Sequence, residues 1–244
     1  MRLDSYLTEH EYYESRTRAR RAVEEGCVSV NGKLVRKPAF EVSETDRIEA
    51  AADPVPYVSR GAFKLAYALE QFRIDLSRAA VALDVGASSG GFTEIMLKFG
   101  VKTVYAADVG KGQLAEKLRA DPRVVNMEET DVRSLPEKGF LHFFDFVACD
   151  ASFISLTHIL PSCAAVMKPG ACGVFLIKPQ FEVGKKNVGK GGIVKDKKAV
   201  EEAILRVTEC AEACGFHLEA PVVPSPITGG DGNREFLIYL RTET

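Results

Sequence analysis

The strongest constraint on the fold is an apolar strand that runs directly into a glycine-rich turn. Residues 81–85 read Val-Ala-Leu-Asp-Val, and Gly86, Gly90 and Gly91 follow at once. Glycines between a buried strand and a helix let the backbone approach a ligand at the start of that helix. This feature predicts an open α/β sheet with a ligand site at the carboxyl end of the strand.

Apolar strands and amphipathic helices alternate on both sides of this turn. The expected elements are a helix from Ser59 to about residue 72, a strand at 81–85, a helix at 92–99, a strand at 102–107, a helix at 113–119, strands at 124–125 and 144–149, a helix at 156–167, a strand at 173–177, a helix at 200–214, and strands at 218–223 and 235–240. This order is typical of a doubly wound, Rossmann-like parallel sheet. We expect the last helix and the last two strands to finish its edge.

The first 50 residues predict a separate small α+β unit. Ser15 can cap a basic helix that ends at Gly26, and leucines at i, i+4 precede it in a shorter helix. The pair Asn31-Gly32 is a strong signal for a two-residue hairpin between strands at Val28–Val30 and Leu34–Val35. A helix pair that leads into a small sheet therefore precedes the main domain.

A segment with two prolines separates these two parts. It contains Pro54 and Pro56 and no hydrophobic periodicity, which is typical of a linker. The expected organisation is a small domain over residues 1–50, a linker over 51–58 and a main domain over 59–244.

Basic side chains are concentrated in two places, although the net charge is -2. The candidates for RNA contact in the first domain are Arg2, Arg16, Arg18, Arg20, Arg21, Lys33, Arg36 and Lys37. Residues 185–198 hold six lysines against one aspartate. One such run is more often a solvated face, but two of them in different parts of the chain favour an anionic partner.

Several classes of protein are disfavoured by simple counts. No stretch approaches the ~18 uncharged apolar residues of a spanning helix, and the first residues lack the apolar run of a signal peptide. The six cysteines form no C-x-x-C pair, and the four histidines stand far apart. We expect a cytoplasmic monomer with buried thiols, no membrane association and no metal ion.

The glycine turn and two later aspartates predict a site for an adenosyl cofactor. The glycine spacing departs from the G-x-G-x-x-G of dinucleotide enzymes, so S-adenosylmethionine is favoured over NAD. Asp108 ends the second strand, where it can accept from ribose hydroxyls, and Asp131 follows the third, where it can accept from the adenine amino group. The alternative is a glycine-rich connection without a ligand. The candidate residues are Asp84, Gly86, Ala87, Ser88, Gly90, Gly91, Phe92, Asp108 and Asp131.

Two charged residues at strand ends are candidates for catalysis. Asp150 ends the strand at 144–149, and Lys178 ends the very apolar strand at 173–177. Parallel strands place their carboxyl ends at one edge, so both side chains are expected beside the cofactor. A lysine that only extends into solvent from a strand end is the alternative. Spacing alone does not single out Lys64 or Glu235.

The first domain resembles the alpha-L RNA-binding domain of a ribosomal protein, several pseudouridine synthases and some tRNA synthetases. The matching segments are residues 2–4, 15–16, 20–26 and 28–32. The resemblance implies that this domain binds RNA.

Five ordered motifs resemble the TlyA-type ribosomal RNA methyltransferases, often labelled hemolysins, whose catalytic domain is of the FtsJ type. They are residues 59–65, 84–93, 150–156, 178–182 and 232–237. The resemblance implies 2′-O-methylation of cytidine in the ribosomal RNA of ribosomal subunits. Ser89 and Glu94 replace an expected threonine and aspartate, and the acidic Asp53 stands where basic linker residues are common.

The resemblance also implies a tetrad of Lys64, Asp150, Lys178 and Glu235. A ribose hydroxyl is a weak nucleophile, so proton removal is required, and Lys178 is the expected general base. Lys64 would favour the loss of its proton, while the two carboxylates orient the lysines. An RNA-binding assembly protein without catalysis and a membrane-lytic hemolysin are the alternatives, which the complete tetrad and the missing apolar segment disfavour.

Overall fold

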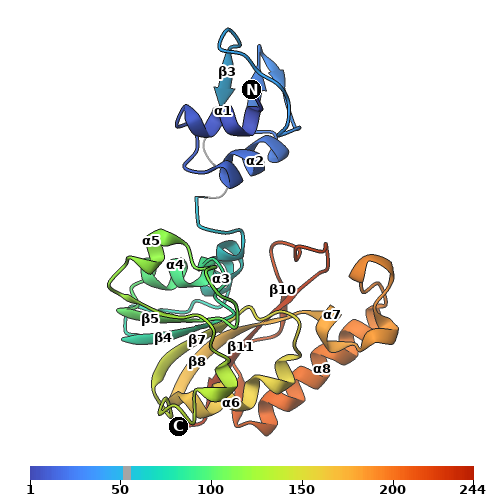
Figure 1. Ribbon diagram of the computed structural model, residues 1–244. Helices are drawn as coiled ribbons and strands as arrows, with labels where there is room; N and C mark the ends of the chain where they lie inside the picture. Colours follow the sequence, from blue (N-terminus) through green and yellow to red (C-terminus); the bar gives the residue numbers. More distant parts are fainter. Residues whose placement is uncertain (52–55) are drawn as a thin grey trace. The chain divides into compact units, whose positions relative to one another are not determined.

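The computed structural model describes residues 1–51 and 56–244 of the chain (Figure 1). The residues group into two compact units, Met1–Pro56 and Tyr57–Thr244. The linker predicted at residues 51–58 falls partly on residues 52–55, which lie outside the described residues. Each unit has its own hydrophobic core.

Within the described residues, one sheet of eight strands forms the frame of the larger unit, in the order β10-β11-β8-β7-β4-β5-β6, with β9 paired to β11. The strands are β4 (Val81–Val85), β5 (Thr103–Ala107), β6 (Val124–Met127), β7 (Phe144–Cys149), β8 (Met167–Ile177), β9 (Phe216–Leu218), β10 (Val223–Pro224) and β11 (Phe236–Thr242). Strands β4 to β8 are parallel, which confirms the predicted Rossmann-like sheet. Strand β11 is antiparallel and lies between β8 and β10, so the last strands of the chain finish one edge of the sheet, as predicted.

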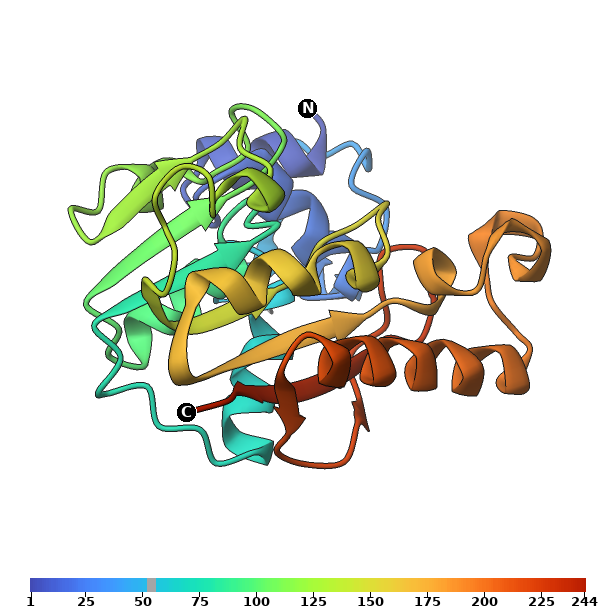
Figure 2. The ribbon, with the colours of Figure 1, turned by 90° about the horizontal axis from the view of Figure 1, so that it is seen from below.

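Helices cover both faces of this sheet. On one face, α3, α4 and α5 bury Leu65, Ile95 and Leu118. On the other, α6 and α8 bury Leu160 and Val207, and these two helices lie side by side in Figure 2. The larger unit is therefore a three-layer α/β structure. The helices are α3 (Gly61–Gln71), α4 (Gly91–Lys98), α5 (Glu116–Arg119), α6 (Leu160–Val166), α7 (Pro179–Glu182) and α8 (Lys197–Ala213).

Prolines divide two of the predicted elements. The helix predicted at 156–167 is a 3₁₀ turn, η2 (Leu156–His158), followed by α6, which has Pro161 in its first turn. Proline is tolerated there because the first helical N–H groups have no partner inside the helix. The strand predicted at 218–223 is two strands, β9 and β10, with Pro221 between them. A proline has no N–H to donate to a sheet.

Two other elements differ in length. The helix predicted at 113–119 is the short α5, because the N–H groups of Gln113 and Leu114 donate to the Glu128 carboxylate instead of entering a helix. The strand predicted at 173–177 begins six residues earlier, since β8 starts at Met167 and pairs there with β7. Local patterns give the elements, and neighbouring segments set their ends.

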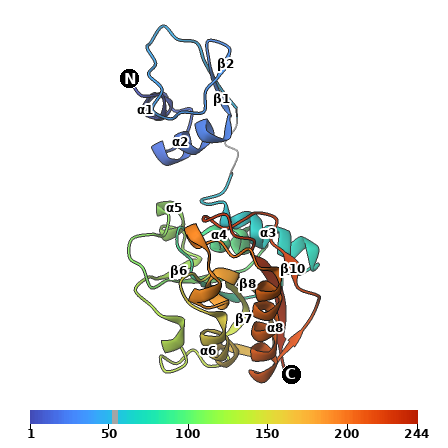
Figure 3. The same ribbon diagram turned by 90° about the vertical axis from the view of Figure 1, so that its right-hand side faces the viewer.

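The smaller unit packs two helices against a three-stranded antiparallel sheet of order β2-β1-β3. Its elements are α1 (Leu3–Glu9), α2 (Arg16–Glu25), β1 (Val28–Val30), β2 (Lys33–Leu34) and β3 (Ile48–Ala50). The Ser15 side chain caps α2, and Gly26 ends that helix with φ 82°. The predicted hairpin is confirmed, with β1 and β2 side by side in Figure 3 and positive φ at Asn31 and Gly32. Strand β3 was not predicted.

Candidate active site

Two cavities open where β4, β5, β7 and β8 end at one edge of the sheet. Their volumes are about 420 Å³ and 560 Å³. Four lining residues belong to both cavities, namely Gly86, Ser88, Asp150 and Ser152. A ligand with two parts can therefore place one part in each cavity and its middle at this junction.

The turn after β4 passes close to the loop that follows β7. Gly86 has φ 77°, and a Cβ atom there would lie 3.0 Å from the Ala151 backbone. A side chain at this position would push the two loops apart. The other predicted turn residues that line the first cavity are Ala87, Ser88, Gly91 and Phe92.

Gly90 is the one predicted turn residue that lies outside the lining of both cavities. It precedes α4 with φ 93°, and a Cβ atom there would overlap the side chains of Leu114 and Leu118. This glycine is needed for the start of α4 and for the packing of that helix against the segment around α5.

Asp84 is a buried carboxyl that faces the first cavity. Its Oδ2 atom accepts from the Thr93 backbone N–H at 2.8 Å and from the Thr93 hydroxyl at 2.6 Å. Its Oδ1 atom has no hydrogen-bond partner among the described residues. Burial raises the pKa of Asp84 to about 7, although the Thr93 bonds act in the opposite direction. The first cavity thus contains a carboxyl that a ligand cation would keep ionised.

The two predicted adenosine-binding aspartates line the second cavity. The Asp108 carboxylate accepts from the Ser88 N–H at 2.8 Å and the Gly110 N–H at 2.7 Å, which fixes its direction. Asp131 is engaged by the Arg133 guanidinium at 2.6 Å, and this hydrogen bond lowers the pKa of Asp131. Asp108 is therefore oriented toward a ligand, whereas Asp131 already has a cationic partner.

The structure brings Lys64, Asp150, Lys178 and Glu235 together at the first cavity. The Asp150 carboxylate lies between the two lysines, with Oδ2 3.2 Å from Lys64 Nζ and Oδ1 2.7 Å from Lys178 Nζ. Glu235 Oε2 lies 2.6 Å from Lys64 Nζ. Two cations and two anions balance each other in this buried place, as buried charges require.

The antiparallel strand β11 explains the position of Glu235. Phe236 pairs with Ile177 of β8, so Glu235 and Lys178 are neighbours in the next register position. Lys64 comes from the first turns of α3, which packs against α4. Both residues reach the site through long-range packing, which is why the spacing of the sequence did not indicate them.

Ser152 is a member of the site that the sequence did not indicate. Its Oγ atom lies 2.7 Å from Lys178 Nζ, and the side chain lines both cavities. The signal that could have found it is its place two residues after Asp150, in the loop at the strand end.

Phe153, the next residue, is 91% exposed and has φ 64°. Its ring lies 5.3 Å from that of Phe181, which follows Lys178 in α7. A non-glycine residue at positive φ is uncommon, and an exposed aromatic ring beside a site offers a face on which a planar group can stack.

Residues 57–242 match the family model described as FtsJ-like methyltransferase, and residues 1–48 match the S4 domain. The chain belongs to the FtsJ-like methyltransferase family. This membership confirms the methyltransferase fold and activity that the sequence predicted.

Relatives cover both units of this FtsJ-like methyltransferase. The 16S/23S rRNA (cytidine-2′-O)-methyltransferase TlyA of Mycobacterium tuberculosis is 43% identical over 244 residues, which are 100% of this chain and 90% of the relative. Hemolysin A of Brachyspira hyodysenteriae is 40% identical, and the matched region spans 98% of this chain and 99% of the relative. A solved hemolysin structure from Streptococcus thermophilus has a TM-score of 0.76 at 38% identity and covers 100% of this chain and 88% of that one. The resemblance to TlyA-type proteins is confirmed.

In the S4 domain of this methyltransferase, two of the predicted RNA-binding arginines have an internal partner. Arg2 and Arg16 lie 2.8 Å and 3.2 Å from the buried Asp4 carboxylate. The hydrogen bond from Arg2 is the main reason why the pKa of Asp4 falls to about 2. Both guanidinium groups are about half exposed, so each has one side toward Asp4 and one toward solvent.

The other predicted basic residues of the S4 domain differ in their partners and in their exposure. Arg18 and Arg20 form i,i+4 ion pairs with glutamates, at 3.3 Å and 2.9 Å. Arg36 donates to a backbone carbonyl, while Lys33 and Lys37 are exposed. Arg21 is half-buried and has a partner.

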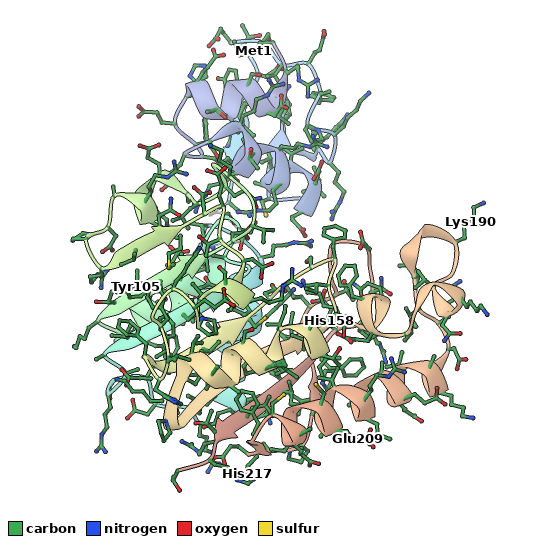
Figure 4. All side chains as sticks on the ribbon, turned by 60° about the horizontal axis from the view of Figure 1, so that its bottom comes forward. Met1, Tyr105, His158, Lys190, Glu209 and His217 are labelled. Atoms are coloured by element: carbon green, nitrogen blue, oxygen red, sulfur yellow. The ribbon has the colours of Figure 1, made fainter. Side chains whose placement is uncertain are left out.

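The lysine-rich segment of the methyltransferase unit, residues 185–198, connects α7 to α8. The exposed lysines with described side chains are Lys186, Lys190, Lys195, Lys197 and Lys198. Its one acid, Asp196, caps α8 by accepting from the Lys198 N–H at 2.9 Å. Figure 4 shows Lys190 pointing away from the sheet. This segment is an exposed basic surface on the catalytic unit.

Two features, a metal-binding group and a membrane-spanning helix, are absent from the part of the chain that the structure describes. No three His, Cys, Asp or Glu side chains there lie in a group that could hold a metal ion. No helix there has the length and apolar character needed to cross a membrane.

Proposed function

We propose that this protein transfers a methyl group from S-adenosylmethionine to the 2′-hydroxyl of cytidine in ribosomal RNA. The observation that carries the proposal is the cluster of two lysines and two carboxylates at the first cavity, of which Asp150 also lines the second. Its support is the family membership of the chain and its 43% identity to a relative named for this reaction.

The residues present fit the cofactor. The unpartnered Asp84 Oδ1 suits the ammonium group of the methionine part in the first cavity. Asp108, held by two backbone N–H groups in the second cavity, suits the ribose hydroxyls. Recognition of the adenine amino group by Asp131 stays a prediction, because Arg133 engages both of its carboxylate oxygens.

S-adenosylmethionine supplies an electrophilic methyl group on a sulfonium sulfur. The protein must therefore orient the ribose hydroxyl and remove its proton. Lys178 is the proposed base, because its Nζ atom contacts Ser152 and Asp150, and both of these residues line the two cavities. Asp150 holds both lysines in place, and Glu235 holds Lys64. The remaining N–H of Lys64 is available to steady the ribose oxygen.

Two basic surfaces support an RNA substrate. The S4 domain supplies affinity through its arginines and lysines, and the lysine-rich segment supplies a second phosphate contact on the catalytic unit. We propose ribosomal subunits as the form of the substrate and the cytoplasm as the location of the protein. We propose that it acts as a monomer, with functional domains at residues 1–50 and 59–244 and a linker at 51–58.

The test is transfer of a labelled methyl group to purified ribosomal subunits, compared with the same RNA free of protein. We expect label in ribosomal RNA at cytidine, stable to alkali because the 2′-oxygen is blocked. RNA binding without transfer to any subunit would indicate an assembly protein and contradict the proposal.

A further inference from the structure

We propose that Ser152 is a further catalytic residue, which passes the proton of the substrate hydroxyl to Lys178. The inference rests on the proposed function and deepens it.

The Lys178 nitrogen is held by the loop that follows β7. In the described part of the chain, three oxygens lie close to Nζ: Asp150 Oδ1 at 2.7 Å, the Asp150 backbone oxygen at 3.2 Å and Ser152 Oγ at 2.7 Å. An ammonium group has three N–H bonds and no lone pair. The charged lysine donates hydrogen bonds to the backbone oxygen and to Ser152, and it forms an ion pair with the Asp150 carboxylate.

Only one of these three partners can reverse its role when the lysine is neutral. The ionised carboxylate and the carbonyl of Asp150 can only accept, whereas a serine hydroxyl can also donate. A neutral amine has two N–H bonds, which suit the two Asp150 oxygens, and one lone pair. The Ser152 hydroxyl is the group that can donate to this lone pair.

Exposure places Ser152 between the lysine and the substrate. The Lys178 side chain is only 8% exposed and lines the first cavity alone, whereas Ser152 is exposed and lines both cavities. A ribose hydroxyl at the junction of the cavities can therefore contact the serine oxygen, which in turn contacts the lysine nitrogen.

The proton transfer follows from this arrangement. The substrate O–H bond breaks as its proton moves to Ser152 Oγ, while the serine's own proton moves to the lone pair of Lys178 Nζ. Serine ends neutral, lysine ends as the ammonium with the contacts seen in the structure, and the ribose oxygen is left to accept the methyl group. Release of the proton to water after product departure resets the pair.

The charged and titratable groups around Lys178 come from four other elements. They are Lys64 of α3, Asp84 at the end of β4, Cys149 and Asp150 at the end of β7, and Glu235 before β11. Of these groups only Asp150 both contacts Nζ and lines the two cavities, and its ionised carboxylate has no proton to pass to the lysine.

The first measurement compares Ser152→Ala and Ser152→Thr with the unchanged protein on ribosomal subunits. We expect Ser152→Ala to lower kcat by about 100-fold, the lower range for loss of a proton-transfer group, with KM and the cofactor Kd unchanged. Ser152→Thr keeps a hydroxyl and should recover most of the turnover. Ser155→Ala is the matched control, since that hydroxyl in the same loop donates to Glu182 and should leave kcat within a few-fold.

The second measurement is the Kd of S-adenosylmethionine for the unchanged protein and for both Ser152 variants. Because the relay acts on the proton of the substrate hydroxyl, the Kd should stay unchanged in Ser152→Ala. A loss of cofactor affinity that parallels the loss of turnover would mean that Ser152 shapes the cofactor site and would overturn the relay.

Turnover of Ser152→Ala within threefold of the unchanged protein, or failure of Ser152→Thr to recover it, also overturns the inference. Failure of the proposed function is distinguishable, because the unchanged protein would then transfer no methyl group to any subunit.

Discussion

Among the described residues, each unit of the molecule buries one aspartate almost completely, and the two surroundings shift its pKa in opposite directions. Asp4 of the S4 domain is 2% exposed, and its pKa falls to about 2. Asp84 of the methyltransferase unit is 0% exposed, and its pKa rises to about 7. Burial alone opposes ionisation at both positions.

The difference lies in the cations that each unit provides. Asp4 has the guanidinium groups of Arg2 and Arg16 within 3.2 Å. Asp84 has the Thr93 donors, and the nearby Asp108 and Asp150 raise its pKa further. The small unit completes its own charge balance, which is a structural arrangement. The large unit leaves a carboxyl that a ligand must complete, which is typical of a binding site.

The largest expected effect comes from Lys178 and tests whether the charged cluster of the methyltransferase unit takes part in methyl transfer. Lys178→Ala should lower turnover by roughly a hundredfold to ten-thousandfold, as expected for loss of a general base, with little change in cofactor affinity. Lys178→Arg should fail as well, because a guanidinium does not release its proton in this pH range. Single-turnover methyl transfer measures both, and near-full activity of Lys178→Arg would show that the residue is only an electrostatic anchor.

The second effect concerns the stability of the ligand-free protein. The pKa of Asp84 in the folded protein lies above its ordinary value of 3.8. The favourable contribution of Asp84 to the free energy of unfolding is therefore complete only below about pH 4 and is lost as the pH rises through 7. The Asp84→Asn variant should not show this loss. Its free energy of unfolding relative to that of the unchanged protein should therefore rise by on the order of 3–4 kcal/mol between pH 4 and pH 8. Urea unfolding at several pH values measures it. A constant difference across this range would contradict the raised pKa.

The third effect is the opposite one in the S4 domain. The pKa of Asp4 in the folded protein lies below 3.8. Its favourable contribution to the free energy of unfolding is therefore complete above about pH 4 and is lost as the pH falls through 2. Asp4→Asn should destabilise this unit by ~1–2 kcal/mol at pH 7, allowing for the half-exposed arginines, and by little near pH 2. Thermal unfolding of both proteins at the two pH values provides the comparison, and equal destabilisation at both would argue against the ion pairs.

The smallest effect separates structural from RNA-contacting cations in the S4 domain. Lys33→Ala should weaken binding to ribosomal RNA by a few-fold and reduce the salt slope of log K by about one, without a change in stability. Arg16→Ala should also lower the unfolding temperature, because Arg16 holds Asp4. Filter binding at several salt concentrations, with unfolding curves, tests the pair. Equal stability of the two variants would place Arg16 among the freely solvated cations.

The sequence by itself determined the parts of the molecule that depend on local chemistry. The run from Asp84 to Phe92 specified a strand, a tight turn and a helix, because glycine permits φ values that other residues avoid. The hairpin at Asn31-Gly32 and the Ser15 cap follow from the same kind of local preference. Asp150 and Lys178 could be placed at one edge because parallel strands share the direction of their carboxyl ends.

Tertiary structure alone decided which distant side chains complete these parts. Glu235 reaches the site because β11 enters the sheet antiparallel beside β8, and Lys64 because α3 packs against α4. Ser152 acquires its contact with Lys178 from the approach of two strand-end loops. Arg16 binds Asp4 across two helices. Pairing between distant segments depends on register and on burial of the whole core, and neither is encoded in the spacing of neighbouring residues.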